Sequence, residues 1–263
     1  MSLINRVLYP IDFSPRCHGT AAYVEALVGR FDAELILLHV VEPPTYNSLL
    51  AEPKAIGPKA FDDFFGPDIR FLRVERLVEH GEPARKIVEC AASRQVDLIM
   101  LPTQGMGIFR RLLLGSTAAK VLHDADCPVW TGVHMESAPQ LDSVPLRRIV
   151  CAVDLKESSA RVLTWAHRIA EEYQAELTLV HARPASERSK AGEALDRLQA
   201  SVGTQAAVRI VEGEPADVVA GLAKELHADL LVIGRRGLAG FLGRLEMTAY
   251  SIIRQSPCPV VSV

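Results

Sequence analysis

The sequence predicts two tandem α/β domains, each a doubly wound sandwich in which helices cover both faces of a parallel sheet. Two observations lead to this prediction: the chain repeats a set of motifs in one fixed order, and short apolar runs alternate with segments of helical periodicity. A length of 263 residues suits a two-domain chain, and a hydrophobic content of 49% is enough for a packed core in each domain.

The internal repeat places the domain boundary. Gly-Glu-Pro-Ala at 81–84 returns at 213–216, Leu-Leu-His-Val at 37–40 returns as Leu-Val-His-Ala at 179–182, and each copy closes on Cys-Pro-Val, at 127–129 and 258–260. We therefore expect domains at residues 1–138 and 146–263, joined by a segment that contains Pro139 and Pro145.

The first copy is longer than the second. It holds about ten additional residues between two of the shared motifs, within a Pro- and Gly-rich segment at 42–70. An irregular segment of this length is often a lid or an interface, and a surface excursion explains it equally well.

Buried strands are expected where apolar residues run without polar interruption. Because such strands are apolar on both faces and are separated by helical patterns, the sheets should be parallel. The expected strands are Val7–Ile11, Glu34–Val41, Leu98–Leu101, Val129–Val133, Ile149–Val153, Leu177–His181, Val208–Val211, Leu230–Ile233 and Val260–Val263.

The helix starts also carry signals. Ser14-Pro15 supplies a capping hydroxyl followed by a proline at the first helical position. Glu82-Pro83 and Glu214-Pro215 open a helix in each copy, and the last helix of the first copy is expected to begin near Ser116.

Composition limits the classes of partner. A net charge of −3 and a pI of about 6.3 predict no general attraction to nucleic acid. No apolar run approaches the roughly 20 residues that span a bilayer, and the first residues lack the apolar core of a signal peptide. Five cysteines without a dense framework fit a reducing compartment, so we expect a cytoplasmic protein that binds neither nucleic acid nor membrane.

A Gly-rich loop follows the fourth strand in each copy, at residues 101–116 and 233–248. In doubly wound sheets, ligands bind at the carboxyl ends of the strands, where this loop should lie. Glycine lets the backbone approach a ligand, and a helix that opens at Gly115-Ser116 would present free N–H groups to a phosphate. The alternative is a plain turn before a capped helix, and the glycines alone favour neither reading.

The combined motifs resemble those of the universal stress protein family. They are Gly-x2-Gly-x9-Gly-Ser/Thr, an Asp at the end of the first strand, and the closing Cys-Pro-Val, and they cover nearly the whole chain as two tandem domains. The resemblance implies the adenine nucleotide α-hydrolase-like fold, with five parallel strands in the order 3-2-1-4-5, and ATP as the ligand of some members but not of others. It also implies pairing through the last strand. We therefore expect Val129–Val133 to pair with Val260–Val263 in an internal pseudo-dimer, with or without association of two chains.

The resemblance implies a nucleotide site in each copy. Neither copy keeps the whole loop motif, because Pro102 replaces the first Gly in one and Met247 replaces the third Gly in the other. Met247 would place a long side chain where a phosphate should approach bare backbone, so the first copy is predicted to be the better site. The implied contacts are Ile11, Asp12, Val40, Pro102, Gly105, Gly115, Ser116 and Thr117 in the first copy, and Val153, Asp154, Ala182, Gly234, Gly237 and Thr248 in the second.

Some polar residues near these sites have structural alternatives. Asp12 can cap the helix that follows it as readily as it can contact a ligand. His39 and His181 lie within apolar strands, and we expect them to be satisfied structural residues rather than catalysts.

The sequence favours a binding protein over an enzyme. No nucleotide-hydrolase loop, nucleophile with its base, or metal-ligand cluster is recognisable, so we expect no catalytic residue and no metal site. The preferred hypothesis is a stress-response regulatory protein that binds ATP, with or without Mg²⁺, and turns it over inefficiently if at all. The alternatives are an interaction or scaffold module whose nucleotide sites have decayed, and a slow ATP hydrolase.

Overall fold

The computed structural model describes residues 2–42, 60–61, 73–102, 114–132, 145–183, 190–235 and 244–263, which fold as two compact units. Met1–Pro102 and Gly115–Pro128 belong to the first unit, whereas Val129–His134 and Pro145–Val263 belong to the second. Within the described residues, no helix is both long and apolar enough to cross a membrane. Most of the segment at 42–70 lies outside the described residues, so its predicted role as a lid, an interface or a surface excursion stays a prediction.

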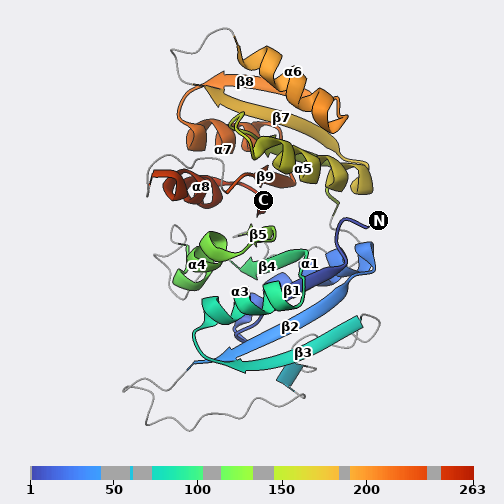
Figure 1. Ribbon diagram of the computed structural model, residues 1–263, viewed down its shortest axis with the longest axis vertical. Helices are drawn as coiled ribbons and strands as arrows, with labels where there is room; N and C mark the ends of the chain where they lie inside the picture. The colour runs from blue at the N-terminus through green and yellow to red at the C-terminus, as the bar shows by residue number, and fades with distance from the viewer. Residues whose placement is uncertain are drawn as a thin grey trace. The chain divides into compact units, whose positions relative to one another are not determined.

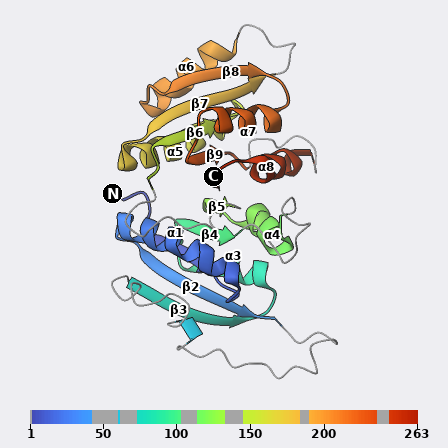
Figure 2. The same ribbon diagram turned by 180° about the vertical axis from the view of Figure 1, so that it is seen from behind.

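The first unit is built on parallel strands in the order β3-β2-β1-β4. Figures 1 and 2 show helix α1 on one face of this sheet and helix α3 on the other. Its elements are β1 (Arg6–Pro10), α1 (Pro15–Phe31), β2 (Glu34–Val41), β3 (Arg73–His80), α3 (Pro83–Ser93), β4 (Leu98–Pro102) and α4 (Ser116–Asp124).

The second unit repeats this pattern and includes one strand from before the linker. Its parallel strands follow the order β8-β7-β6-β9-β10, which is the predicted order 3-2-1-4-5, and α5 and α7 cover opposite faces (Figures 1 and 2). Its elements are β5 (Val129–Gly132), β6 (Arg148–Ala152), α5 (Ser159–Tyr173), β7 (Glu176–Arg183), α6 (Ala191–Val202), β8 (Ala207–Glu212), α7 (Pro215–Glu225), β9 (Leu230–Ile233), α8 (Arg244–Gln255) and β10 (Val260–Ser262).

Strand β5 pairs antiparallel with β10. Trp130 lies opposite Val261, and Thr131 lies opposite Val260. The Thr131 hydroxyl donates to the Val260 carbonyl at 3.3 Å, and both strands are buried. The predicted pairing of these two strands is therefore confirmed.

The expected helix starts are also confirmed. The Ser14 hydroxyl accepts a hydrogen bond from the Cys17 amide at 3.5 Å, and α1 begins at Pro15. Glu82 caps α3, because its carboxylate accepts from the Arg85 amide at 2.7 Å. These local signals succeed because they satisfy backbone donors that have no partner within the helix.

The sequence reading missed strand β3. The sequence of Arg73–His80 contains no continuous apolar run. Its residues are exposed or half-buried, and Val78 is 41% exposed. Its backbone is nevertheless paired with β2 along its whole length. Charged residues interrupt the apolar pattern of this edge strand at Arg73, Glu75, Arg76 and Glu79, which is why periodicity did not reveal it.

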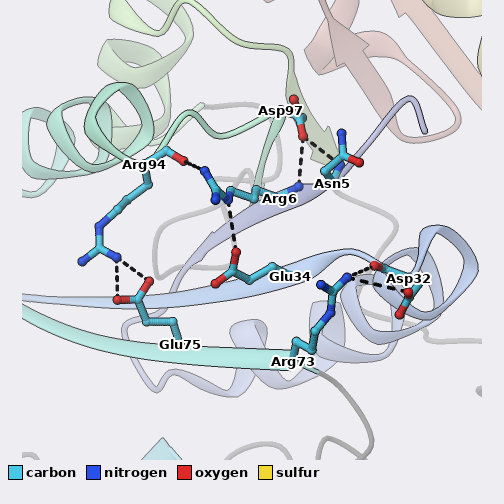
Figure 3. A network of polar contacts seen from close by, with 8 residues as sticks. All are labelled: Asn5, Arg6, Asp32, Glu34, Arg73, Glu75, Arg94 and Asp97. Carbon is cyan, nitrogen blue, oxygen red and sulfur yellow. Dashed lines mark hydrogen bonds and ion pairs between the residues drawn. The ribbon is translucent and has the colours of Figure 1, made fainter. Parts of the chain in front are cut away.

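A set of polar contacts holds the amino ends of the strands in the first unit (Figure 3). The Asp97 carboxylate accepts hydrogen bonds from the backbone N–H groups of Asn5 and Arg6, at 2.7 and 3.0 Å. The Arg6 guanidinium reaches Glu34 at 3.1 Å and donates to the Arg94 carbonyl at 2.8 Å. Figure 3 also shows the ion pairs of Arg94 with Glu75 and of Arg73 with Asp32.

In the second unit, Asp229 makes the same pair of backbone contacts as Asp97 makes in the first. Its carboxylate accepts from the backbone N–H groups of Arg147 and Arg148, both at 2.8 Å. Because these contacts lie at the amino ends of the strands, they stabilise the sheets without occupying the edge where ligands bind.

Gly213 is required by the turn between β8 and α7. Its φ is +146°, and a Cβ added there would lie 3.0 Å from a methyl of Val218. We expect Gly213→Ala to lower the free energy of unfolding by about 1–2 kcal/mol. Gly221 lies inside α7 with nothing within 4 Å of an added Cβ, so Gly221→Ala should raise stability by about 0.5–1 kcal/mol. Urea unfolding of both variants checks this, and equal effects of the same sign would contradict it.

Candidate functional site

A pocket lies at the carboxyl ends of the strands in the second unit. Strands β6, β7 and β9 and the first turns of α5 and α7 contribute to it, together with α8. It brings together every second-copy site residue that the structure describes, namely Val153, Asp154, Ala182, Gly234 and Thr248; the predicted Gly237 lies outside the described residues. The remaining lining residues are Ala152, Ser158, Ser159, Val162, Val180, Pro215, Val219, Ile233 and Ile252.

Among the described residues that line this pocket, Asp154 is the one acidic group. Its Oδ1 accepts from the Lys156 amide and from the Ser159 hydroxyl, both at 3.0 Å. Its Oδ2 is buried and has no hydrogen-bond partner within the described part of the chain, and the Lys156 ammonium lies 3.8 Å away on an exposed side chain. A carboxylate oxygen in this state is an acceptor for a donor that the protein does not supply.

Gly234 allows α5 to approach the end of β9. A Cβ at this position would lie 3.2 Å from a methyl of Val162 and 3.9 Å from the Ser158 hydroxyl. The first glycine of the loop motif therefore has a packing role as well as a place in the pocket. His181 has a structural role too, because its Nδ1 lies 2.9 Å from the Val153 carbonyl oxygen and the side chain is buried.

The first copy places its predicted residues at the same edge of its own sheet. Ile11 follows β1, Val40 lies near the end of β2, and Pro102 ends β4. The Ile11 amide donates to the Leu38 carbonyl at 2.8 Å. The Ile11 carbonyl oxygen lies 2.8 Å from Nδ1 of the His39 ring. Both histidines are thus hydrogen-bonded within their own sheets, as predicted. The predicted site residue Gly105 lies outside the described residues.

Asp12 hydrogen-bonds to the start of α1, where Ser14 is the N-cap, and its predicted contact with a ligand stays a prediction. Its Oδ1 accepts from the Ser14 amide at 2.9 Å and from the Cys17 thiol at 3.0 Å. Burial raises the pKa of the Asp12 carboxyl, but these hydrogen bonds outweigh burial and hold the pKa below its usual value. Asp12 is therefore ionised at neutral pH and is fixed at the start of α1.

A sequence model of the universal stress protein family matches residues 4–131 and 145–263. The chain belongs to the universal stress protein family. The two matched segments show that it carries two tandem domains of this family.

Relatives of this universal stress protein agree in name and in fold. A universal stress protein of Mycolicibacterium smegmatis is 25% identical over 98% of this chain and 96% of its own length. A universal stress protein of Methanocaldococcus jannaschii is 29% identical and covers 49% of this chain and 81% of its own length. The crystal structure of a universal stress protein from Archaeoglobus fulgidus superposes with a TM-score of 0.73 at 22% identity, over 98% of this chain and 95% of that one.

The two universal stress protein domains differ at the helix that follows the Gly-rich loop. In the first domain, α4 begins at Ser116, and Gly115 is its N-cap without any side-chain cap. In the second domain, α8 begins at Arg244, so Met247 and Thr248, the counterparts of Gly115 and Ser116, lie inside the helix. The helix start predicted near Ser116 is confirmed, but its counterpart in the second domain is displaced by one turn.

Among the described helix residues that line the pocket, only Thr248 was predicted from the sequence. Ser159 lies five positions after Asp154 and donates to it, just as Cys17 lies five positions after Asp12 and donates to that carboxylate. The repeated spacing of a small donor after the aspartate was the available signal. Val162, Val219 and Ile252 follow ordinary helical periodicity, which does not separate pocket residues from core residues.

The thiol of Cys17 should resist alkylation in the folded protein. Burial and the neighbouring Asp12 carboxylate raise its pKa to about 12, so the thiolate fraction at pH 8 is on the order of 10⁻⁴. We expect iodoacetamide to label Cys17 at least about 10³-fold more slowly than a small thiol of ordinary pKa, as followed by peptide mass spectrometry. Labelling in urea is the control, and a folded-state rate equal to that of glutathione would contradict the buried hydrogen bond to Asp12.

Proposed function

We propose that this universal stress protein is a regulatory protein that binds an adenine nucleotide, with ATP bound in its first domain without efficient turnover. The observation that carries the proposal is the start of α4. Gly115 caps the helix without a side chain, Ser116 is exposed, and the first N–H groups of the helix have no partner within it. Such a helix start suits a phosphate, because its N–H groups and its dipole both favour negative charge.

The rest of the first-domain site supports the same ligand. The ionised Asp12 and the backbone of Ile11 follow β1, and the backbone of Val40 lies near the end of β2, at the edge of the sheet where the base and ribose would bind. In the second domain, the equivalent edge forms the pocket around Asp154, which would take the base and ribose of the same ligand class.

The cytoplasm is the compartment we propose for this function. No disulfide joins the five cysteines, and Cys17, Cys90, Cys151 and Cys258 are buried. Burial raises the pKa of the Cys258 thiol to about 11, so it packs as a small apolar group. This pattern suits a reducing environment.

Two measurements on the whole chain test the proposal. Protein purified without added nucleotide is denatured, and the released small molecules are identified by chromatography. Calorimetric titration with ATP, with and without Mg²⁺, then measures affinity. If no nucleotide is released and no heat is measured at about millimolar ATP, the proposal is wrong. The alternative would then hold, namely an interaction module whose nucleotide sites have decayed, which the losses at Pro102 and Met247 favour.

Turnover is tested separately. Phosphate release from Mg-ATP should stay at the background rate, because Oδ1 of Asp12, the acidic residue proposed for this site, already accepts hydrogen bonds from the Ser14 amide and the Cys17 thiol. Steady ATP hydrolysis that is lost in Asp12→Asn would instead support the slow ATP hydrolase.

A further inference from the structure

We infer that the pocket of the second domain takes a nucleoside, an uncharged base with its ribose, in preference to a nucleoside triphosphate. This rests on the proposed function, since it assumes that the pocket receives the base and ribose of an adenine ligand. It goes further by assigning the two domains of one chain to different ligands of that class. Three independent observations in the second domain lead to it.

The first observation is the position of the start of α8. Helix α8 begins at Arg244, so Met247 is its fourth residue and Thr248 its fifth. From the fourth residue onward, each N–H of an α-helix is bonded to the carbonyl four positions earlier. The N–H groups of Met247 and Thr248, at the positions equivalent to Gly115 and Ser116, are therefore bonded within α8, and the free N–H groups belong to its first three residues instead. Thr248, which lines the pocket, has no backbone donor to offer a phosphate.

The second observation is the charge of the lining. Among the described residues that line the pocket, Asp154 is the only charged one, and no lysine or arginine accompanies it. The nearest cation recorded for it is Lys156, 3.8 Å from Oδ2 and 52% exposed to solvent. Among the described lining residues, this carboxylate therefore has no buried counter-charge, so it repels the several negative charges of a triphosphate and has no such effect on a nucleoside.

The third observation is the acceptor that the pocket leaves vacant. Asp154 uses Oδ1 for the Lys156 amide and the Ser159 hydroxyl, whereas the buried Oδ2 accepts no hydrogen bond. A ribose hydroxyl or an exocyclic amine is a neutral donor that satisfies this oxygen. Apolar side chains from β6, β7, α7 and α8 supply the remaining surface, which suits the flat face of a base.

The test is calorimetric titration of the full chain carrying Gly115→Trp, which blocks the helix start of the first domain. Adenosine and ATP are titrated separately, and near-UV circular dichroism confirms the fold. We expect adenosine to bind about tenfold more tightly than ATP. If ATP binds more tightly than adenosine, the inference is wrong and the proposed function stands. If neither compound produces heat, the proposed function of the second domain fails and this inference fails with it.

Two further variants in the same background locate the ligand. Ala182→Trp fills the pocket from β7 and should weaken adenosine binding at least about 30-fold. Unchanged adenosine binding would place the ligand elsewhere and overturn the inference. Asp154→Asn keeps an oxygen for Lys156 and Ser159 but removes the charge, so the preference for adenosine over ATP should fall by about tenfold. Asp229→Asn changes the same residue type at the opposite end of the sheet and should leave the preference unchanged.

Discussion

Replacing Trp130 with alanine should lower the free energy of unfolding of the second unit by about 4 kcal/mol. Trp130 is fully buried in β5, where it lies opposite Val261 of β10. Its removal deletes a large apolar surface and leaves a cavity in a strand pair that is buried along its whole length. The cost should therefore lie near the upper end for single core substitutions.

Trp130→Phe separates packing from polarity. The indole Nε1 is buried and has no hydrogen-bond partner among the residues that the structure describes, so phenylalanine removes an unsatisfied donor while it keeps an aromatic ring. We expect the free energy of unfolding to fall by about 1 kcal/mol or less, because removal of the unpaired N–H offsets part of the cost of the lost packing.

Urea unfolding followed by circular dichroism checks both substitutions. The surface control is Val78→Ala, at a position that is 41% exposed, with an expected change within about 0.5 kcal/mol. A Trp130→Ala variant as stable as Val78→Ala would mean that β5 does not belong to the core of the second unit.

Most of the fold could be predicted because burial and local capping leave marks on the sequence. β6, β7 and β9 read as apolar runs since they are covered on both faces, and the Gly-Glu-Pro motifs mark the turns into α3 and α7. β3 left no such mark because its side chains face solvent while its backbone pairs with β2. The other edge strand, β8, is also exposed but was predicted from Val208–Val211, where a single arginine interrupts the apolar residues, whereas several charged residues interrupt β3.

The second-domain site could be predicted at its strand ends and at Thr248, but the residue at which α8 begins could not. Asp154, Ala182 and Gly234 follow strand ends, and parallel strands bring their carboxyl ends to one edge. The early start of α8 could not be read from the motif alignment, which places Met247 beside Gly115. Glycine disfavours helix and methionine favours it, so this replacement removes the helix boundary as well as the bare backbone.

Gly115→Trp should weaken ATP binding by at least about 100-fold, a loss of roughly 2.7 kcal/mol. Gly115 has φ −60° and ψ 149°, in the extended region that every residue adopts without strain. The substitution therefore leaves the backbone of the cap unstrained. Its side chain instead fills the approach to the N–H groups of the first turn of α4, which are the proposed phosphate donors.

The size of the side chain provides the matched series. Gly115→Ala adds one methyl group at an unstrained position, so ATP affinity should fall by no more than about threefold. Ala182→Trp blocks only the second-domain pocket, so the affinity of the first domain for ATP should change by no more than about threefold. Calorimetric titration of the three variants, with thermal unfolding as the stability control, distinguishes a blocked phosphate site from a damaged fold. ATP affinity that survives Gly115→Trp would show that the phosphates bind elsewhere, because no rearrangement of a rigid helix start accommodates both an indole and a phosphate in one place.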